Sequence, residues 1–423
     1  MKLAESMLEV TSPHDILSAS ESAARERLGR VLERHQDRLV PLGLLEPLKA
    51  VCRSSPVFAP FMLVHSPFEF LLEQLEESGK QNKEQDNLYF GERLKLLCVA
   101  PLWASGISFP MSFEKECFPQ PAPVNYTNLI LDLRHYPGEK FELKPPAFDF
   151  EERICLLRSP PNPSPYLCLN PSDYYCYSSK KGNLYLFAEI ARGESAHEIE
   201  WEGKLFDEIV DGIERAKGLL RDYEPGLLEE VEFFVRGFVI DFSASGWSYG
   251  SLMFLPGLIY MAPQFLLSEK NREWIPLEKE NALLGILVAA QIIHESSHQK
   301  HYFINRCEDT TPQSGYQTSF VRPEFKEIPL TCLWTDPPHT RYFLAFFSLS
   351  ISVGSELHFL EHALLTQKLG RKEREVLQMK IRRKRRYLLS LLVQGELAQD
   401  YFSPEGKVLL ERLFQEYQYK SGV

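Results

Sequence analysis

Residues 283–300 read LLGILVAAQIIHESSHQK, an apolar run that ends in a polar pentad. On a helix, His294 and His298 lie on one face and one turn apart, so that their imidazoles can hold a single metal ion. Glu295 lies on an adjacent part of that face, where it can reach a bound water or carry a proton. The pentad therefore predicts a metal site, with His294 and His298 as ligands and Glu295 as the catalytic residue.

The alternative interpretation of the pentad is a solvated turn that follows a core helix. A polar cluster set directly against eleven mostly apolar residues costs free energy unless it has a partner. This cost favours the metal site over the solvated turn.

Composition and charge exclude some classes of partner. The chain has 423 residues and a formal net charge of −11 at pH 7. Nucleic acid is not an expected partner, because phosphate binding needs a basic surface. The basic run within residues 371–386 is the local exception, and it predicts either a solvated helix face or a contact with an acidic partner segment.

The chain carries no sequence signal for secretion or for a membrane. Residues 1–6 include an early acid and no apolar segment follows as a signal peptide requires, and the apolar run before the pentad is too short to span a bilayer. The eight cysteines form no C-x-x-C pair, which is typical of reduced thiols. We expect a cytoplasmic protein that does not bind a membrane.

Three regions follow from the pattern along the chain, and together they predict an α+β fold. Residues 1–90 are expected to be a helical N-terminal region with a polar loop at 81–87, and residues 91–195 a strand- and proline-rich region. Residues 196–423 are expected to form a mainly helical, metal-binding catalytic domain. Within it we expect extended runs at 231–240 and 252–260, a long helix from Pro337 onward, and helices at 366–395 and 404–418.

A mononuclear site needs at least a third ligand beyond the pentad. An extended form of the motif places a third His at the position that Ile304 occupies here, so that extension is absent. We favour His339, because it follows a long loop at an expected helix start, where ligands are often presented. Four downstream residues are the other candidates: Glu356, His358, Glu361 and His362.

The segment 294–300, preceded by Ser243-Ala244-Ser245-Gly246 and by Pro256-Gly257-Leu258-Ile259-Tyr260, carries a resemblance to a known family. It resembles the HExxH-type 2-oxoglutarate-dependent peptide β-hydroxylases, which accompany ribosomally made, post-translationally modified peptides. The resemblance covers residues 230–365, about a third of the chain. Residues 334–338 are similar to a Trp-Arg-Asp-Pro-Arg-Pro loop of that family, but both of its arginines are missing. Arg322 and Arg341 are the nearest replacements.

The resemblance implies an oxygenase that uses Fe(II), 2-oxoglutarate and O₂. The reaction would insert oxygen at an unactivated β-carbon of a residue in a precursor peptide with a leader. Arg322 and Arg341 become the candidates to bind the distal carboxylate of 2-oxoglutarate, since arginine forms planar, bidentate bonds to carboxylates.

Two other functions stay open. One is a zinc metallopeptidase, in which Glu295 activates water against a peptide carbonyl. The other is a peptide-binding module without catalytic activity. Neither a third His at position 304 nor a methionine turn supports the peptidase.

Overall fold

The structure is a computed structural model of the whole chain. The residues that it describes are mostly helical, with short strands in four small sheets, and this composition is compatible with an α+β fold. The described residues are 29, 32–37, 39–53, 84–104, 111–119, 122–124, 129–143, 167–169, 175–179, 203–235, 237–241, 249–251, 258–261, 282–306, 320–333 and 339–417.

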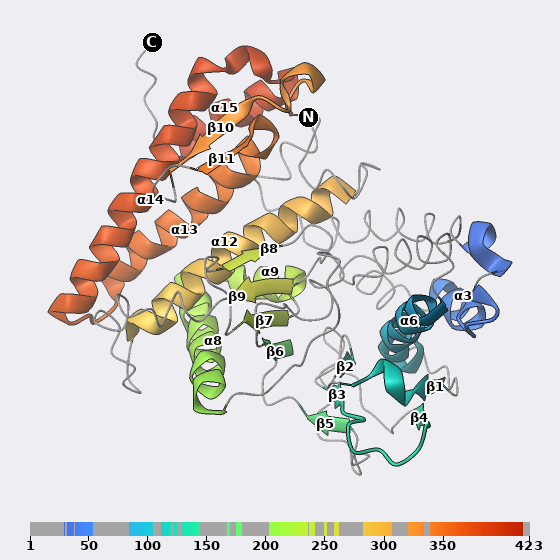
Figure 1. Cartoon of the computed structure of the whole chain (residues 1–423). Coiled ribbons are helices and arrows are strands. Elements are labelled where there is room, and N and C mark those ends of the chain that lie inside the picture. Colours follow the sequence, from blue (N-terminus) through green and yellow to red (C-terminus); the bar gives the residue numbers. More distant parts are fainter. Residues whose placement is uncertain are drawn as a thin grey trace.

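Four C-terminal helices form the part of the fold that carries the pentad. They are α12 (Ala282–Arg306), α13 (Phe346–Thr366), α14 (Arg371–Leu397) and α15 (Pro404–Glu416). Helix α13 packs against α12 on one side and against α14 on the other, and α14 lies at the edge of the molecule (Figure 1). Most of the apolar run before the pentad is buried, which explains why the first half of α12 carries so few charges.

Two further helices support α12 from the other side. Helix α8 (Gly203–Tyr223) packs against it closely, because Gly212 leaves room for Leu284 and Val288. Helix α9 (Leu227–Phe234) begins after Gly226, which adopts a positive φ of 86°. Lys300 of α12 forms an ion pair of 2.9 Å with Glu230 of α9. The pentad helix is therefore held on two sides.

Phenylalanine rings join the first turn of α13 to the segments around it. Phe346 and Phe347 stack or meet edge-on with Phe343, Phe320 and Phe402, at centroid distances of 5.1–5.4 Å. Phe343 belongs to the 3-10 turn η3 (Phe343–Ala345), which connects α13 to the hairpin of β10 (Pro329–Cys332) and β11 (His339–Tyr342). This cluster fixes the hairpin against the start of α13.

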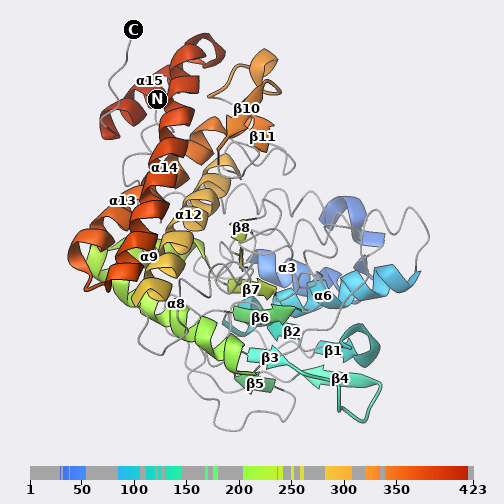
Figure 2. The same cartoon turned by 60° about the vertical axis from the view of Figure 1, so that its left-hand side comes forward.

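The largest sheet lies beside α12 and has the strand order β6-β7-β9-β8 (Figure 2). Its members are β6 (Tyr175–Ser179), β7 (Gly237–Asp241), β8 (Tyr249–Ser251) and β9 (Leu258–Met261). The pairs β6–β7 and β7–β9 are parallel, whereas β8 pairs antiparallel with β9.

The N-terminal part contributes helices and two further small sheets. Its helices are α3 (Leu45–Arg53) and α6 (Glu84–Ala104), which pack against each other. Strand β1 (Met111–Glu114) pairs with β4 (Lys140–Leu143), while β3 (Leu129–Leu131) lies between β2 (Ala122–Val124) and β5 (Leu167–Leu169). The strand-rich character expected of residues 91–195 is therefore present in the part of this region that the structure describes.

Several expectations about individual elements are wrong. The helix expected from Pro337 begins only at Phe346, because residues 339–342 pair with β10 as a strand. Helix α6 begins at Glu84, inside the expected loop, and continues to residue 104. Residues 231–234 end helix α9 instead of starting a strand. In each case tertiary packing overrides a local signal.

Other expectations are confirmed. Helices α12, α14 and α15 lie where the sequence places helices. Residues 258–260 are extended, in agreement with the second expected run. The segment 343–366 is long and apolar enough to cross a membrane, but 78% of its window is buried inside the protein, as is usual for a core helix.

The close approach of α13, α14 and α15 gives a first prediction. A Cβ added at Gly395 would lie 2.4 Å from Cζ of Phe346, which is fully buried among other rings. We expect Gly395→Ala to lower the free energy of unfolding by about 1–3 kcal/mol, as overpacking does. In α8, Gly218 has nothing within 4 Å of such a Cβ, so Gly218→Ala should be neutral or stabilising by up to about 1 kcal/mol. Urea unfolding of both variants measures the difference, and equal effects would contradict this packing.

Candidate metal site

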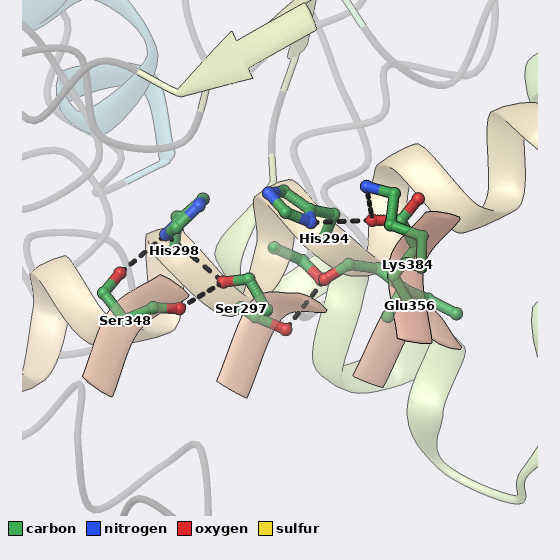
Figure 3. Close-up of polar contacts among 9 residues, drawn as sticks. His294, Ser297, His298, Ser348, Glu356 and Lys384 are labelled. Atoms are coloured by element: carbon green, nitrogen blue, oxygen red, sulfur yellow. Dashed lines mark hydrogen bonds and ion pairs between the residues drawn. The ribbon is translucent and has the colours of Figure 1, made fainter. Parts of the chain in front are cut away.

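The two histidines of the pentad lie side by side on α12, at its contact with α13. Their ring centroids are 4.9 Å apart and the ring planes are 77° to each other. His294 is 7% exposed and His298 is 9% exposed. Figure 3 shows that one nitrogen of each ring is turned toward polar side chains and that the other lies toward the neighbouring ring.

His294 is anchored by a charged pair that comes from two other helices. Its Nδ1 lies 2.8 Å from Oε2 of Glu356 in α13, and the same oxygen lies 2.5 Å from Nζ of Lys384 in α14. Glu356 is 1% exposed. Burial raises the pKa of its carboxyl, but the charge of Lys384 and the hydrogen bond with His294 outweigh this and lower the pKa to about 2.

His298 is anchored by hydroxyl groups instead of charges. Its Nδ1 lies 2.6 Å from Oγ of Ser348 and 3.2 Å from Oγ of Ser352, both in α13. Ser352 also donates to the backbone carbonyl of Ser348 at 2.8 Å. Because the Ser352 proton is used in that bond, its oxygen is free to accept from the histidine.

These contacts hold both rings through the same nitrogen. An ionised Glu356 has no proton to donate, so His294 must donate from Nδ1. In His298 the hydroxyls of Ser348 and Ser352 engage Nδ1, and the direction of the shorter contact with Ser348 depends on the tautomer. Ring nitrogens anchored in this way are typical of metal-ligating histidines.

The electrostatic surroundings keep His298 neutral. Burial lowers the pKa of His298 well below its usual value, and the neighbouring His294, His301, Arg341 and Lys384 lower it further. Burial also lowers the pKa of His301, the next histidine on this face of α12, to about 3. A neutral imidazole does not need to lose a proton before it binds a cation.

The remaining member of the motif, Glu295, is 2% exposed. It follows His294 directly in α12 and lies between the two histidines in sequence.

The structure places the two candidate arginines differently. Arg341 lies in β11, and its charge reaches His298. Arg322 is half exposed and forms an ion pair with Glu324, and it also donates to the backbone carbonyl of Asp400 at 3.2 Å. The charge of Arg341 therefore acts on His298, whereas the contacts of Arg322 are with surface groups.

His339 begins the same strand, two positions before Arg341 and paired in register with Cys332. The other candidates for a third ligand all lie in α13, but only Glu356 contacts the histidine pair. The remaining three candidates contact residues outside the pentad: His358 contacts the ring of Tyr417, Glu361 pairs with Arg385, and His362 contacts the ring of Tyr223.

Two neighbouring imidazoles are a donor pair that suits zinc, iron, copper and nickel. Within the described part of the chain, no group of three His, Cys, Asp or Glu side chains is arranged to hold an ion. The described residues therefore bring together two candidate ligands and no third.

The sequence analysis missed the residues that orient the histidines. Ser348, Ser352 and Glu356 follow one another at intervals of four, so they share one face of the apolar helix α13. Polar residues at helical spacing inside an apolar segment are the signal that could have revealed them. Lys384 had no such signal, because it belongs to a run of basic residues that are mostly exposed.

No protein-family model and no curated protein matches this chain. The geometry of the site therefore carries the functional argument.

The buried histidines predict how stability depends on pH. In the metal-free protein, unfolding lets His301 and His298 return to a pKa near 6.5, so the unfolded state binds more protons than the folded state below that pH. Stability should be complete above about pH 6.5 and fall toward pH 4.5, by up to about 1.4 kcal/mol per pH unit for each histidine.

The control for this prediction is His301→Gln, which removes one of the two groups. Urea unfolding of the metal-free proteins between pH 4.5 and 7.5 should give a shallower slope for the variant, whatever its absolute stability. An identical slope would show that His301 is protonated equally in both states.

Proposed function

We propose that the protein is an Fe(II)- and 2-oxoglutarate-dependent oxygenase that hydroxylates the β-carbon of a residue in a ribosomally made peptide. The observation that supports the proposal is the pair of adjacent imidazoles whose Nδ1 atoms are both held by side chains of α13. His294 and His298 would hold the iron, with His339 as the third ligand. The peptide substrate rests on the resemblance of residues 230–365 to the peptide β-hydroxylases.

The charge of Arg341 supports the use of an anionic cosubstrate. A guanidinium close to His298 provides the partner that a carboxylate needs in a partly dry site. Bound iron would supply the activation of O₂, and the balanced reaction converts peptide C–H, 2-oxoglutarate and O₂ to peptide C–OH, succinate and CO₂. In this proposal His294, His298 and Arg341 position the reactants, and Glu295 helps to orient the ligands.

Turnover of 2-oxoglutarate tests the proposal without knowledge of the peptide. Protein purified anaerobically and loaded with Fe(II) and 2-oxoglutarate should form succinate when O₂ is admitted. His294→Ala and His298→Ala should abolish this turnover, because each removes a ligand. His135→Ala alters an exposed histidine in the turn after β3, so it should behave as wild type. Metal binding without any succinate formation would rule out the oxygenase.

The two arginines make a separate prediction about the cosubstrate. Arg341→Met should raise the 2-oxoglutarate concentration for half-maximal turnover about tenfold or more, which is the effect of losing one charged hydrogen-bonding partner. Arg322→Met should have little effect, because Arg322 pairs with Glu324 on the surface. Titration of succinate formation measures both variants. A larger effect at Arg322 would place the carboxylate site elsewhere.

A zinc metallopeptidase is the second candidate, and one observation favours it. Glu356 comes from a helix later in the chain and contacts the first histidine, as a glutamate ligand of many zinc peptidases does. Its contact is with Nδ1, however, which is the position of an orienting group. Chelator-sensitive cleavage of a denatured protein by the zinc-loaded chain would select this function over the oxygenase.

A further inference from the structure

We propose that Lys384 is a positioning residue for the metal ligand His294, so that helix α14 is part of the site although it supplies no ligand. This inference rests on the metal site of the proposed function, but it does not depend on which metal binds or which reaction follows. The juxtaposition that carries it is the row His294, Glu356 and Lys384, in which one carboxylate oxygen contacts both nitrogen groups.

The first step of the argument is the cost of burying Glu356. A carboxylate that is 1% exposed is unfavourable unless a cation or hydrogen-bond donors compensate it. Lys384 supplies the cation at 2.5 Å, and its own side chain is only 14% exposed. Lys380 of the same helix adds a positive charge that also acts on Glu356, while Lys384 makes the hydrogen bond to its carboxylate.

The second step concerns the orientation of His294. Oε2 of Glu356 contacts both Nδ1 of the ring, at 2.8 Å, and Nζ of Lys384, at 2.5 Å. The ammonium of Lys384 therefore fixes the position of the oxygen that holds the ring. When that oxygen is no longer fixed, the ring loses the contact that orients it toward a metal ion.

The third step is the asymmetry between the two ligands. His298 is held by the hydroxyls of Ser348 and Ser352, whereas His294 is held by a charged group. Only the charged anchor needs a compensating cation. A change at Lys384 should therefore displace His294 more than His298, on which Lys384 acts through its charge.

A simpler interpretation is that the ion pair only joins α13 to α14. The chain offers a matched control for it, because Arg385 also links these helices, through an ion pair of 2.6 Å with Glu361. Arg385 is 63% exposed and its partner does not contact either histidine of the pentad. Variants at 384 and 385 separate a role in the site from a role in helix packing.

The first measurement is metal affinity, with Zn²⁺ and Co²⁺ in competition with a chelator. Lys384→Met should weaken binding about 10- to 100-fold, as the loss of an orienting group does. Lys384→Arg should recover most of the affinity because it keeps the charge, and Arg385→Met should bind as wild type. Equal affinities of Lys384→Met and Arg385→Met would overturn the inference.

A double variant tests whether charge compensation is the cause. Glu356→Gln alone leaves the ammonium of Lys384 buried without its anion and should also weaken binding. Combined with Lys384→Met, it removes both charges and keeps an amide oxygen that can accept from Nδ1 of His294. The double variant should bind more tightly than the additive loss predicts. Strict additivity would contradict the mechanism.

The orientation of His294 is measured in the metal-free protein by NMR of ¹⁵N-labelled histidine, which reports the hydrogen bond at Nδ1. In Lys384→Met, the Nδ1 signal of His294 should shift because the carboxylate that holds it is no longer fixed, whereas Arg385→Met should give the wild-type spectrum. An unchanged His294 signal in Lys384→Met would overturn the inference, even if wild type binds no metal. Absence of metal binding in wild type would instead refute the proposed function.

Discussion

The register between α12 and α13 is the constraint on which the site depends. The two helices are antiparallel neighbours, and their polar groups match at four-residue intervals: Glu356 meets His294, while Ser352 and Ser348 meet His298. A displacement of one residue would leave a buried carboxylate and two buried imidazoles without these partners. Each such loss costs on the order of 1–3 kcal/mol or more, so the polar contacts select one alignment that apolar packing alone would not.

The Glu356–Lys384 pair is charged, so burying it costs more free energy than burying the neutral serine hydroxyls that contact His298. Removing two charges from water is expensive, and well-packed apolar side chains often stabilise a fold as much or more. The pair is thus poorly explained by stability alone. Its contact with Nδ1 of His294 holds that ring in place, which an apolar replacement could not do.

The sequence was sufficient to predict the pentad helix, because eleven mostly apolar residues followed by His294 and His298 have only a few consistent interpretations. It was also sufficient for α14 and α15, whose periodicity and length are typical of helices. It failed at Pro337-Pro338, where a favourable helix-start signal is overridden by pairing of residues 339–342 with β10. Strand pairing is a long-range property that a local signal does not contain.

For the site, the sequence identified the two histidines and included Glu356 among its candidates, but it assigned no role to Ser348, Ser352 or Lys384. Their roles arise only where three helices meet. Arg341 was named for its place near a loop, and the fold brings its charge to His298. Arg322 was named on the same grounds and lies among surface groups. Proximity along the chain could not distinguish the two arginines.

The short connection between β11 and α13 has a mechanical consequence. Arg341 and Ser348 belong to one continuous segment, and the rings of Phe343, Phe346 and Phe347 wedge that segment into the core. This segment therefore fixes the spacing between the guanidinium of Arg341 and the Ser348 hydroxyl that orients His298. Inserting a single residue between them would change that spacing while every chemical group of the site remained present.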